Sequence, residues 1–487
     1  MNGERTTRKD TRRTKIVCTI GPASSEAEQL DRLVAAGMDV ARLNFSHGTH
    51  AEHADVIRRI REGEERWGRP IAILQDLQGP KIRLGTFGEG GGQRVDLVPG
   101  RTFTLTARPT TGTAERATLS HPEYLKELHA GDEILMDDGM IQLRVDAAGA
   151  DEVRCRVLVG GRISDHKGIA LPRVALPMSC LTAKDREDLR FGIQQGIDFV
   201  AISFVRSAAD IADVRKLLRD QGADVPIVAK LERQEVIANL PGILTMVDAV
   251  MVARGDLGLD VPLEDVPQIQ KEVIRQARAA KVPVIVATQM LESMVTHVRP
   301  TRAEVSDVAT AIYDGADAIM LSAETATGRY PAEAVEVMAR IAERAEQAAV
   351  RTLEERRRRK QDGVGFPEAI SDAAATAARV LKARAIVAFT QSGFSARLIS
   401  QERPEVPIIA LTPFAAVQRR LGLTWGVSSR LIRKVETTDE MIEEIEATLL
   451  GDGSVRVNDV IVIISGAPMW VTGTTNLLKL HRVGERR

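Results

Sequence analysis

From residue 14 onward, the sequence alternates strand-length apolar runs with longer amphipathic stretches. The apolar runs are rich in Val and Ile and are bounded by Gly, Pro or Asp, a pattern typical of parallel strands buried on both faces. They span Lys15–Ile20, Asp39–Leu43, Ile71–Leu74, Phe199–Ser203, Pro226–Ala229, Ala249–Val252, Pro283–Ala287 and Ala318–Leu321. The helix-period stretches between them include Glu26–Ala36, Lys184–Gln195, Ala208–Asp220, Pro267–Ala280 and Arg302–Tyr313. This alternation predicts βαβ units and a parallel sheet.

The number of units distinguishes two parallel-sheet architectures. Eight strand-and-helix units is the closure number of the (β/α)8 TIM barrel, whereas a doubly wound open sheet would usually stop earlier. Pro331 is a good first-turn residue and marks the expected start of the last barrel helix. We therefore predict an α/β fold built on a (β/α)8 barrel that residues 14–84 and 177–352 form.

The rhythm is interrupted between residues 85 and 176, where helical periodicity is nearly absent. Strand-like runs at Thr102–Thr106, Ile141–Val145 and Val153–Val159 alternate with Gly-rich turn signals. We predict a small all-β domain here, inserted after the third barrel strand on the face where loops cover an active site.

A further α/β unit follows the barrel, and we predict a separate C-terminal domain over residues 353–487. Its expected elements are a helix at Glu368–Leu381 and strands at Ala385–Thr390, Pro407–Leu411, Asp459–Ser465 and Asn476–Leu480. At the other end, residues 1–13 are basic and polar, and we expect a flexible tail.

Charge and composition argue against several classes of partner. In 487 residues, 66 Lys and Arg balance 67 Asp and Glu, so no global basic field would draw the chain to nucleic acid or an anionic membrane. Apolar runs are strand-sized, well short of the roughly 18 residues of a transmembrane helix. No apolar segment resembling a secretory signal follows the basic N-terminus, and we expect a cytoplasmic protein. Cys18, Cys155 and Cys180 are too few and scattered for a disulfide framework or a zinc site.

Polar and charged side chains follow six of the eight predicted strands. In a TIM barrel the carboxyl ends of the strands meet at one mouth, where catalytic groups lie. The residues that follow these strands are Arg42, Asn44, Ser46 and His47; Asp76, Lys81 and Arg83; Lys230 and Glu232; Arg254, Gly255 and Asp256; Thr288 and Gln289; and Ser322 and Glu324. Salt bridges within the mouth are the structural alternative for Lys230 and Glu232, but the pattern favours an active site.

The residue types at this mouth indicate a reaction class. Glu232 and Asp256 follow neighbouring strands, and two such carboxylates suit either a hard divalent cation or the acid and base of a glycosidase. Arg42, Arg83 and Lys230 make the site cationic, which a phosphorylated anion needs and a glycosidase does not. Cationic side chains with a divalent ion can stabilise a transferring phosphoryl group. The sequence contains no Walker A loop, convincing GxGxxG turn, HExxH helix or CxxC pair.

Long motifs in the same order resemble the pyruvate kinase family along nearly the whole chain. They are Thr19–Ser24, Arg42–Gly48, Asp76–Arg83, Lys230–Glu232, Met251–Gly258, Ala287–Met294, Leu321–Ala326 and Gly473–Asn476. The resemblance implies a barrel, an inserted β lid and a C-terminal α/β domain. It also implies phosphoryl transfer from phosphoenolpyruvate to ADP, giving pyruvate and ATP, the last step of glycolysis.

The resemblance further implies a role for each matching residue. Glu232 and Asp256 would hold Mg²⁺, with Mn²⁺ as an alternative ion, and Lys230 would stabilise the transferring phosphoryl group. Arg42 would contact the substrate phosphate. The backbone of Gly255 and Asp256, with Thr288, would receive the substrate carboxylate, and Thr288 would lie near the route that protonates the enolate carbon. Nucleotide contacts would come from Asn44, Phe45, Ser46, His47, Arg83 and the lid residue Lys167.

The sequence departs from the family at the monovalent-ion site. Family members that use K⁺ would bind it through Asn44, Ser46, Asp76 and the carbonyl of Leu77. They commonly carry a Thr-Lys pair where Leu77-Gln78 stand here, and a Glu where Lys81 stands. Because an ammonium near that pocket can supply the ion's charge, we hypothesise activity without added K⁺. The alternative is that Lys81 points to solvent and the ion site survives.

Other departures concern the lid and regulation. Ala170 stands where the family often has Asn. The loop Ser392–Ser395 resembles the family's loop for a phosphorylated effector, but Phe394 replaces a common basic residue, and an ordinary helix N-cap is nearly as good an interpretation. The resemblance implies a homotetramer. Two alternatives to an active kinase are a phosphoenolpyruvate-binding regulatory protein without activity and another barrel enzyme, such as a mutase or an aldolase.

Overall fold

The computed structural model describes residues 12–172, 174, 179–357, 365–468 and 473–485. Among these residues, eight parallel strands form a closed barrel in the spatial order β1-β16-β15-β14-β13-β12-β3-β2. The strands are β1 (Lys15–Ile20), β2 (Val40–Asn44), β3 (Ala72–Asp76), β12 (Phe199–Ile202), β13 (Ile227–Leu231), β14 (Ala249–Ala253), β15 (Val284–Ala287) and β16 (Ala318–Leu321). Each predicted barrel strand is present to within a residue or two, and the predicted TIM barrel is confirmed.

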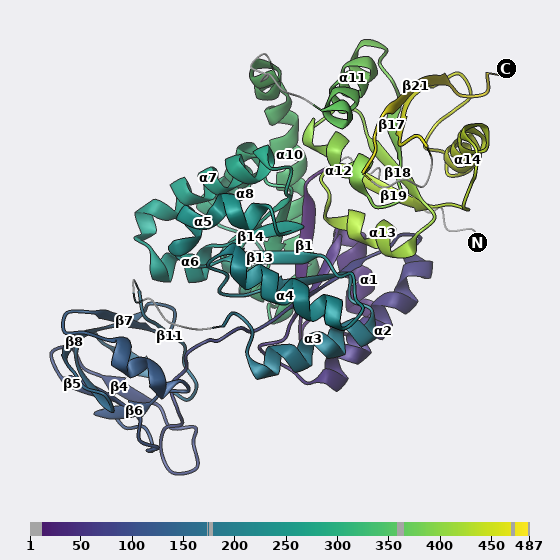
Figure 1. Cartoon of the computed structure of the whole chain (residues 1–487). Helices are drawn as coiled ribbons and strands as arrows, with labels where there is room; N and C mark the ends of the chain where they lie inside the picture. Colours follow the sequence, from purple (N-terminus) through teal and green to yellow (C-terminus); the bar gives the residue numbers. More distant parts are fainter. Residues whose placement is uncertain (1–11, 173, 175–178, 358–364, 469–472, 486–487) are drawn as a thin grey trace.

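Helices surround the barrel (Figure 1). They are α1 (Ala27–Ala36), α2 (His50–Trp67), α3 (Ala183–Gln195), α4 (Ala208–Asp220), α5 (Glu235–Leu244), α6 (Arg254–Asp260), α7 (Val266–Ala279), α8 (Arg302–Asp314), α9 (Ala323–Ala326) and α10 (Pro331–Arg357). Short 3₁₀ turns lie at Leu263–Asp265 and Glu292–Val295. Helices α2, α3 and α8 begin with the same device, a Thr whose side chain and a carboxylate three residues later satisfy each other's backbone amides.

The lid is a separate β unit beside the barrel mouth (Figure 1). Within the described residues, its main sheet has six strands in the order β11-β7-β8-β9-β5-β6, and β4 pairs with β10. The strands are β4 (Val95–Leu97), β5 (Thr102–Thr106), β6 (Arg116–Thr118), β7 (Glu133–Met136), β8 (Ile141–Ala148), β9 (Glu152–Val159), β10 (Gly161–Ile163) and β11 (Ile169–Ala170), with a 3₁₀ helix at Pro122–Glu127. Phe87, Phe103 and Leu143 are fully buried in the lid's own core. The expected return to the barrel at residues 176–177 lies outside the described residues.

The C-terminal domain is an α/β layer structure with the sheet order β19-β18-β17-β20-β21. Its strands are β17 (Ala385–Phe389), β18 (Ile408–Thr412), β19 (Val427–Leu431), β20 (Val460–Ser465) and β21 (Leu477–Arg482). Its helices are α11 (Phe366–Val380), α12 (Phe394–Gln401), α13 (Ala415–Arg420), a 3₁₀ turn at Leu421–Leu423 and α14 (Thr438–Gly451). The four strands expected here are present, and the polar strand β19 is an addition. No described helix is both long enough and apolar enough to span a bilayer.

Four aspartates repeat one structural role at the amino-terminal ends of the barrel strands. They immediately precede the second, fourth, sixth and eighth barrel strands along the chain. The carboxylate of each accepts a hydrogen bond from a backbone amide at or near the start of the barrel strand before it. The pairs are Asp39 with Ile16 (2.9 Å), Asp198 with Ile73 (2.8 Å), Asp248 with Ile227 (2.9 Å) and Asp317 with Val284 (2.9 Å). A buried amide needs an acceptor, and these carboxylates supply one where the staggered sheet does not.

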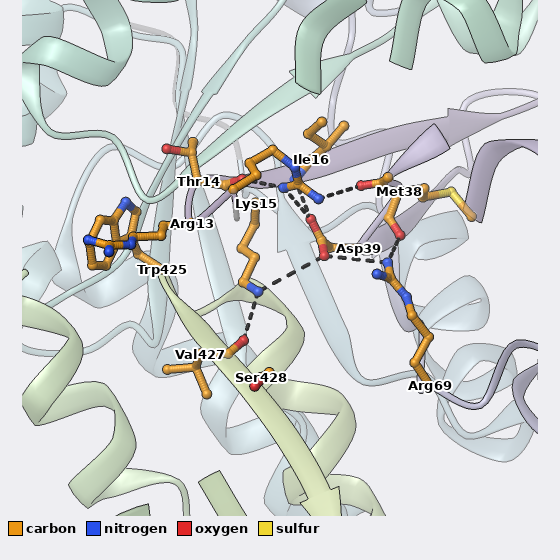
Figure 2. A network of polar contacts seen from close by, with 12 residues as sticks. Arg13, Thr14, Lys15, Ile16, Met38, Asp39, Arg69, Trp425, Val427 and Ser428 are labelled. Carbon is orange, nitrogen blue, oxygen red and sulfur yellow. Dashed lines mark hydrogen bonds and ion pairs between the residues drawn. The ribbon is translucent and has the colours of Figure 1, made fainter. Parts of the chain in front are cut away.

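The C-terminal domain docks on this same end of the barrel. Arg403 pairs with Asp317 at 2.8 Å, and Arg419 pairs with Asp198 at 2.8 Å. Lys15 Nζ, from β1, donates to the carbonyl of Val427 at 2.8 Å (Figure 2). Two of the four aspartates, Asp198 and Asp317, therefore also hold the C-terminal domain.

Arg12 and Arg13 correct the expectation of a flexible tail over residues 1–13. Arg12 is 6% exposed and pairs with Asp39 at 2.8 Å. The Arg13 guanidinium lies over the Trp425 ring (Figure 2). The backbone amide of Arg13 donates to the Glu346 carboxylate. The tail interpretation is therefore wrong for these two residues. A basic stretch resembles a solvated tail when the acidic and aromatic side chains that it contacts are distant in the sequence.

Asp39 should contribute strongly to stability. Burial alone would raise its pKa, but Arg12, Lys15 and Arg69 together lower the pKa of Asp39 to about 2. We expect Asp39→Asn to lower the free energy of unfolding by about 3–5 kcal/mol, because buried cations lose their counter-ion. Asp31 is the matched control, because its side chain is about half exposed and pairs with Arg66 at the surface, and Asp31→Asn should cost about 1 kcal/mol or less. Urea denaturation of both variants measures the difference.

The stabilisation that Asp39 provides should depend on pH. Because the folded pKa of Asp39 is below the roughly 3.9 of an unfolded Asp, its stabilisation is present above about pH 4 and is lost as the pH falls towards 2. The stability gap between the wild type and Asp39→Asn should therefore narrow on acidification. A gap that stays constant from pH 5 to pH 3 would contradict this account of Asp39.

Candidate active site

A cleft lies between the carboxyl ends of the barrel strands and the lid. Lys81, Glu232 and Asp256 line its barrel side, and Asp138 and Ala170 line its lid side. The lid is inserted into the barrel sequence after β3, so its connection to the barrel lies at this edge. The cleft is therefore where the barrel's strand-end residues meet the inserted domain.

A buried cluster of charges lies at the centre of the barrel mouth. Lys230, on β13, has its Nζ 2.8 Å from Glu232 Oε1 and 3.3 Å from Asp76 Oδ1. Asp76, at the end of β3, also accepts from Arg42 Nε at 2.6 Å. Arg42 in turn donates to Thr19 Oγ1 at 2.9 Å. The structure thus brings together side chains from four strands, the first and last of which lie about 200 positions apart in the sequence.

The electrostatics of this cluster keep Lys230 charged. Burial would lower the pKa of Lys230, but Asp76, Glu232 and Asp256 outweigh it and raise that pKa. For Asp76, burial is likewise outweighed by Arg42 and Lys230, which lower its pKa. Burial and the nearby charge of Asp256 raise the pKa of Glu232, against the opposing effect of Lys230. The result is a fixed cation at the mouth with a carboxylate on either side.

Glu232 and Asp256 fit a divalent cation shared with a substrate. Glu232 lies just past β13, and Asp256 is in the first turn of α6. Both line the cleft, and the charge of Asp256 raises the pKa of Glu232, a repulsion that a bound cation would relieve. Among the described residues, no group of three or more His, Cys, Asp or Glu side chains is arranged to hold a metal ion. Two carboxylates suit an ion whose other ligands are substrate oxygens and water.

Thr288 lies in a strained and tightly held loop after β15. Thr288 and Gln289 have φ values of 69° and 54°, in the left-handed region that non-glycine residues rarely adopt. Arg254 donates to the Thr288 carbonyl at 2.7 Å and is itself held by both oxygens of Asp307, at 2.8 and 2.7 Å. The Thr288 hydroxyl accepts from the Gly255 amide at 2.8 Å. The Gly255 amide, at the start of α6, is therefore occupied by the Thr288 hydroxyl in this structure.

The residues expected to contact a nucleotide lie partly on the barrel and partly on the lid. Asn44 is the last residue of β2 and Phe45–His47 follow it, and the Phe45 amide donates to the Asp76 carbonyl at 2.9 Å. Burial, together with the positive charges of Arg83, Lys81 and Arg42, lowers the pKa of His47. Arg83 bridges to Gly168 at the base of the lid. Lys167, by contrast, pairs with Asp137 within the lid at 2.6 Å.

The monovalent-ion residues and Lys81 lie at the same edge. Asn44 is in register with Asp76, and the Leu77 carbonyl accepts from Ser203 Oγ at 2.7 Å, while the Ser46 amide donates to Asn44 Oδ1 at 3.1 Å. Lys81 Nζ is 3.6 Å from Asp256 Oδ1, and its side chain is 29% exposed. Lys81 therefore points into the cleft toward a carboxylate rather than freely to solvent.

The sequence analysis missed Ser203 and assigned no role to Arg254. Ser203 ends the fourth predicted strand, and its hydroxyl accepts from Lys230 Nζ at 2.8 Å. A polar residue at a strand end was the available signal. The role of Arg254 depends on a left-handed backbone at Thr288, which nothing in the sequence announces.

The burial of Lys230 gives a stability prediction. Lys230→Met removes the cation between two buried carboxylates, and we expect it to destabilise the fold by about 3–5 kcal/mol. Lys81→Met removes a partly exposed cation and should cost about 1 kcal/mol or less. Equal losses in denaturant unfolding would contradict the assigned difference between the two lysines.

Known proteins resemble this chain over almost all of it. A family model of the pyruvate kinase barrel domain matches residues 11–335, and one of the pyruvate kinase alpha/beta domain matches residues 368–481. The pyruvate kinase of Mycobacterium tuberculosis is 45% identical over 98% of this chain and 99% of its own length. That of Geobacillus stearothermophilus is 45% identical over 97% of this chain and 81% of its own length.

A solved structure extends the similarity to three dimensions. The crystal structure of a pyruvate kinase from Cryptosporidium parvum matches with a TM-score of 0.90 and 34% identity, covering 97% of this chain and 96% of that one. The barrel, the C-terminal domain and nearly the full length of the sequence therefore agree. The chain belongs to the pyruvate kinase family of phosphotransferases.

Proposed function

We propose that the barrel mouth transfers the phosphoryl group of phosphoenolpyruvate to ADP, giving pyruvate and ATP. The observation that carries this proposal is the charged, buried Lys230 flanked by Asp76 and Glu232, of which Glu232 lines the cleft beside the lid. A regulatory protein that only binds phosphoenolpyruvate would not need Lys230, Glu232, Asp256 and Thr288 together. A mutase or an aldolase would not need the inserted lid or the C-terminal domain.

The residues of the mouth divide the work. Lys230 and Arg42 neutralise the phosphoryl oxygens, and their carboxylate partners hold both cations in place before substrate arrives. Glu232 and Asp256 would hold Mg²⁺, or Mn²⁺ in its place. A bound divalent ion supplies charge stabilisation for the phosphoryl and enolate oxygens.

Thr288 and the first turn of α6 form the carboxylate end of the substrate site. The amides of Gly255 and Asp256 lie at a helix start, where backbone N–H groups favour an anion. The Thr288 hydroxyl bridges this turn to the strained loop after β15, near the route by which the enolate carbon would gain its proton. The Arg254–Asp307 pair keeps that loop in its left-handed conformation.

The nucleotide would bind between the barrel and the lid. Asn44, Ser46, His47 and Arg83 would supply the barrel side, and Lys167 would supply the lid side. Phe45 would shape this segment rather than contact the nucleotide, because its ring is buried and its amide and carbonyl are already hydrogen-bonded within the protein. In this structure Lys167 pairs with Asp137, so the nucleotide phosphates would compete for its ammonium as the lid closes. Closure of the lid would also exclude water from the site. Transfer of the phosphoryl group to water would consume phosphoenolpyruvate without making ATP.

Substitution of either Mg²⁺ carboxylate tests this assignment. Glu232→Gln and Asp256→Asn should lower kcat by at least about 100-fold and raise the Mg²⁺ concentration needed for half-maximal pyruvate formation. Glu264→Gln, an exposed carboxylate close to α6, serves as the matched control and should behave as the wild type. Full activity of both site variants at ordinary Mg²⁺ concentrations would refute the assignment.

We further propose that Lys81 makes the enzyme independent of K⁺. Its ammonium points into the cleft, 3.6 Å from Asp256, and acts electrostatically on His47 in the loop that would contribute ion ligands. A second positive charge close by in a medium of low dielectric would be repelled. The ligand set of Asn44, Ser46, Asp76 and the Leu77 carbonyl would then need no monovalent ion.

Activity in buffer free of K⁺ and Na⁺ tests the role of Lys81. The wild type should gain less than about twofold in kcat on adding K⁺, whereas Lys81→Gln should lose activity and regain part of it with K⁺. A control titration with a tetramethylammonium salt separates ionic strength from ion binding. Strong activation of the wild type by K⁺ would reject this proposal and leave the kinase assignment intact.

Three family-implied properties remain predictions. A phosphorylated effector would bind at Ser392–Ser395, although the Ser395 hydroxyl here lies 2.7 Å from Thr475 Oγ1 in a buried pair. A homotetramer and a cytoplasmic location are the other two.

A further inference from the structure

Helix α3 and the start of α2 carry a second set of polar side chains, next to the segment Asn44–Gly48. Lys184 Nζ donates to the backbone carbonyl of Phe45 at 2.8 Å and pairs with Asp188 Oδ2 at 2.6 Å. The other carboxylate oxygen of Asp188 lies 2.7 Å from His50 Nε2. The Asp188 side chain is only 4% exposed, while those of Lys184 and His50 are about half exposed, at 52% and 45%. One buried carboxylate thus fixes two side chains that border the segment.

Ring packing and a second backbone contact hold the same segment. The Phe45 side chain is buried, and its ring stacks on His53 with centroids 4.0 Å apart and planes 13° apart. His53 Nε2 lies 3.0 Å from the carbonyl of His47. The carbonyls of Phe45 and His47 are therefore both engaged by side chains of the surrounding helices. The rings of His50 and Phe191, stacked at 4.2 Å, close the other side of this packing.

Helix α3 also contacts the neighbouring strand and the segment that follows it. Its Asp185 accepts from the Gly79 amide at 3.1 Å, within the turn after β3. The backbone carbonyl of Asp188 accepts from the Gln75 side-chain amide at 2.7 Å, one residue before Asp76. The first two turns of α3 thus contact the segment that follows β2, the end of β3 and the turn after β3.

We propose that Lys184 and Asp188 are positioning residues that hold the segment Asn44–Gly48 in its nucleotide-binding conformation. The inference rests on the proposed role of that segment in nucleotide binding. Neither side chain is assigned a contact with the reacting atoms, so their removal loosens the segment without changing the charges at the centre of the mouth. Nucleotide binding must then spend free energy on ordering the loop, which weakens affinity. Phosphoenolpyruvate, held at Arg42, Lys230 and Thr288, should be little affected.

Substitution of Lys184 tests this inference by separating the two substrates. Lys184→Met should raise KM for ADP about fivefold, the loss expected for one such hydrogen bond, with kcat and the KM for phosphoenolpyruvate within about twofold of the wild type. Lys184→Arg keeps a donor and should restore most of the affinity for ADP. Arg190→Met removes an exposed cation from the same helix and should change neither KM. Asp188→Asn should shift KM for ADP in the same direction as Lys184→Met.

A reference variant distinguishes failure of this inference from failure of the proposed nucleotide site. His47→Ala should raise KM for ADP if Asn44–His47 contact the nucleotide. If His47→Ala raises it and both Lys184→Met and Asp188→Asn leave it unchanged, the positioning role is wrong and the nucleotide site stands. If none of the three changes it, both assignments fail. Equal increases in both KM values for Lys184→Met would also overturn the inference, because they would indicate general damage to the mouth.

Discussion

Lys230 carries its ammonium into the barrel, where a charge without partners would be neutralised or expelled. Asp76 at 3.3 Å and Glu232 at 2.8 Å make its burial tolerable, and Arg42 compensates the second charge of this group by pairing with Asp76. Because each ion depends on the others, β2, β3 and β13 must end at matched heights around the mouth. The barrel therefore fixes a preformed cationic centre, and the proposed chemistry needs little rearrangement when a phosphorylated substrate arrives.

The opposite end of the barrel uses the same pairing for a different purpose. Asp39, Asp198 and Asp317 are buried, accept strand amides and pair with arginines. For Asp198 and Asp317, one of these arginines comes from the C-terminal domain, which is how that domain is seated against the strand starts. The proposed active site at the carboxyl ends of the strands and the domain contact at their amino ends thus both depend on buried charges. The apolar core of the barrel lies between them.

The fold could be predicted because it depends on local pattern. Each barrel strand is a short buried run with turn residues at its ends, and eight such runs leave few architectures. Much of the mouth could be predicted for the same reason, since strand ends in a barrel converge. Arg12 could not be placed, because its partner Asp39 lies just before the next strand and only the folded barrel brings the two side chains to 2.8 Å. The four-aspartate repeat requires knowing which strands are adjacent, and the Arg254 contact requires a positive φ at Thr288.

The most direct test of this account is to measure pyruvate and ATP together in one reaction of the purified chain with phosphoenolpyruvate, ADP and Mg²⁺. Because the proposed reaction passes the phosphoryl group to ADP and not to water, the account predicts one ATP for each pyruvate and no pyruvate when ADP is omitted. Pyruvate released without ATP, or no turnover by folded protein, would contradict it.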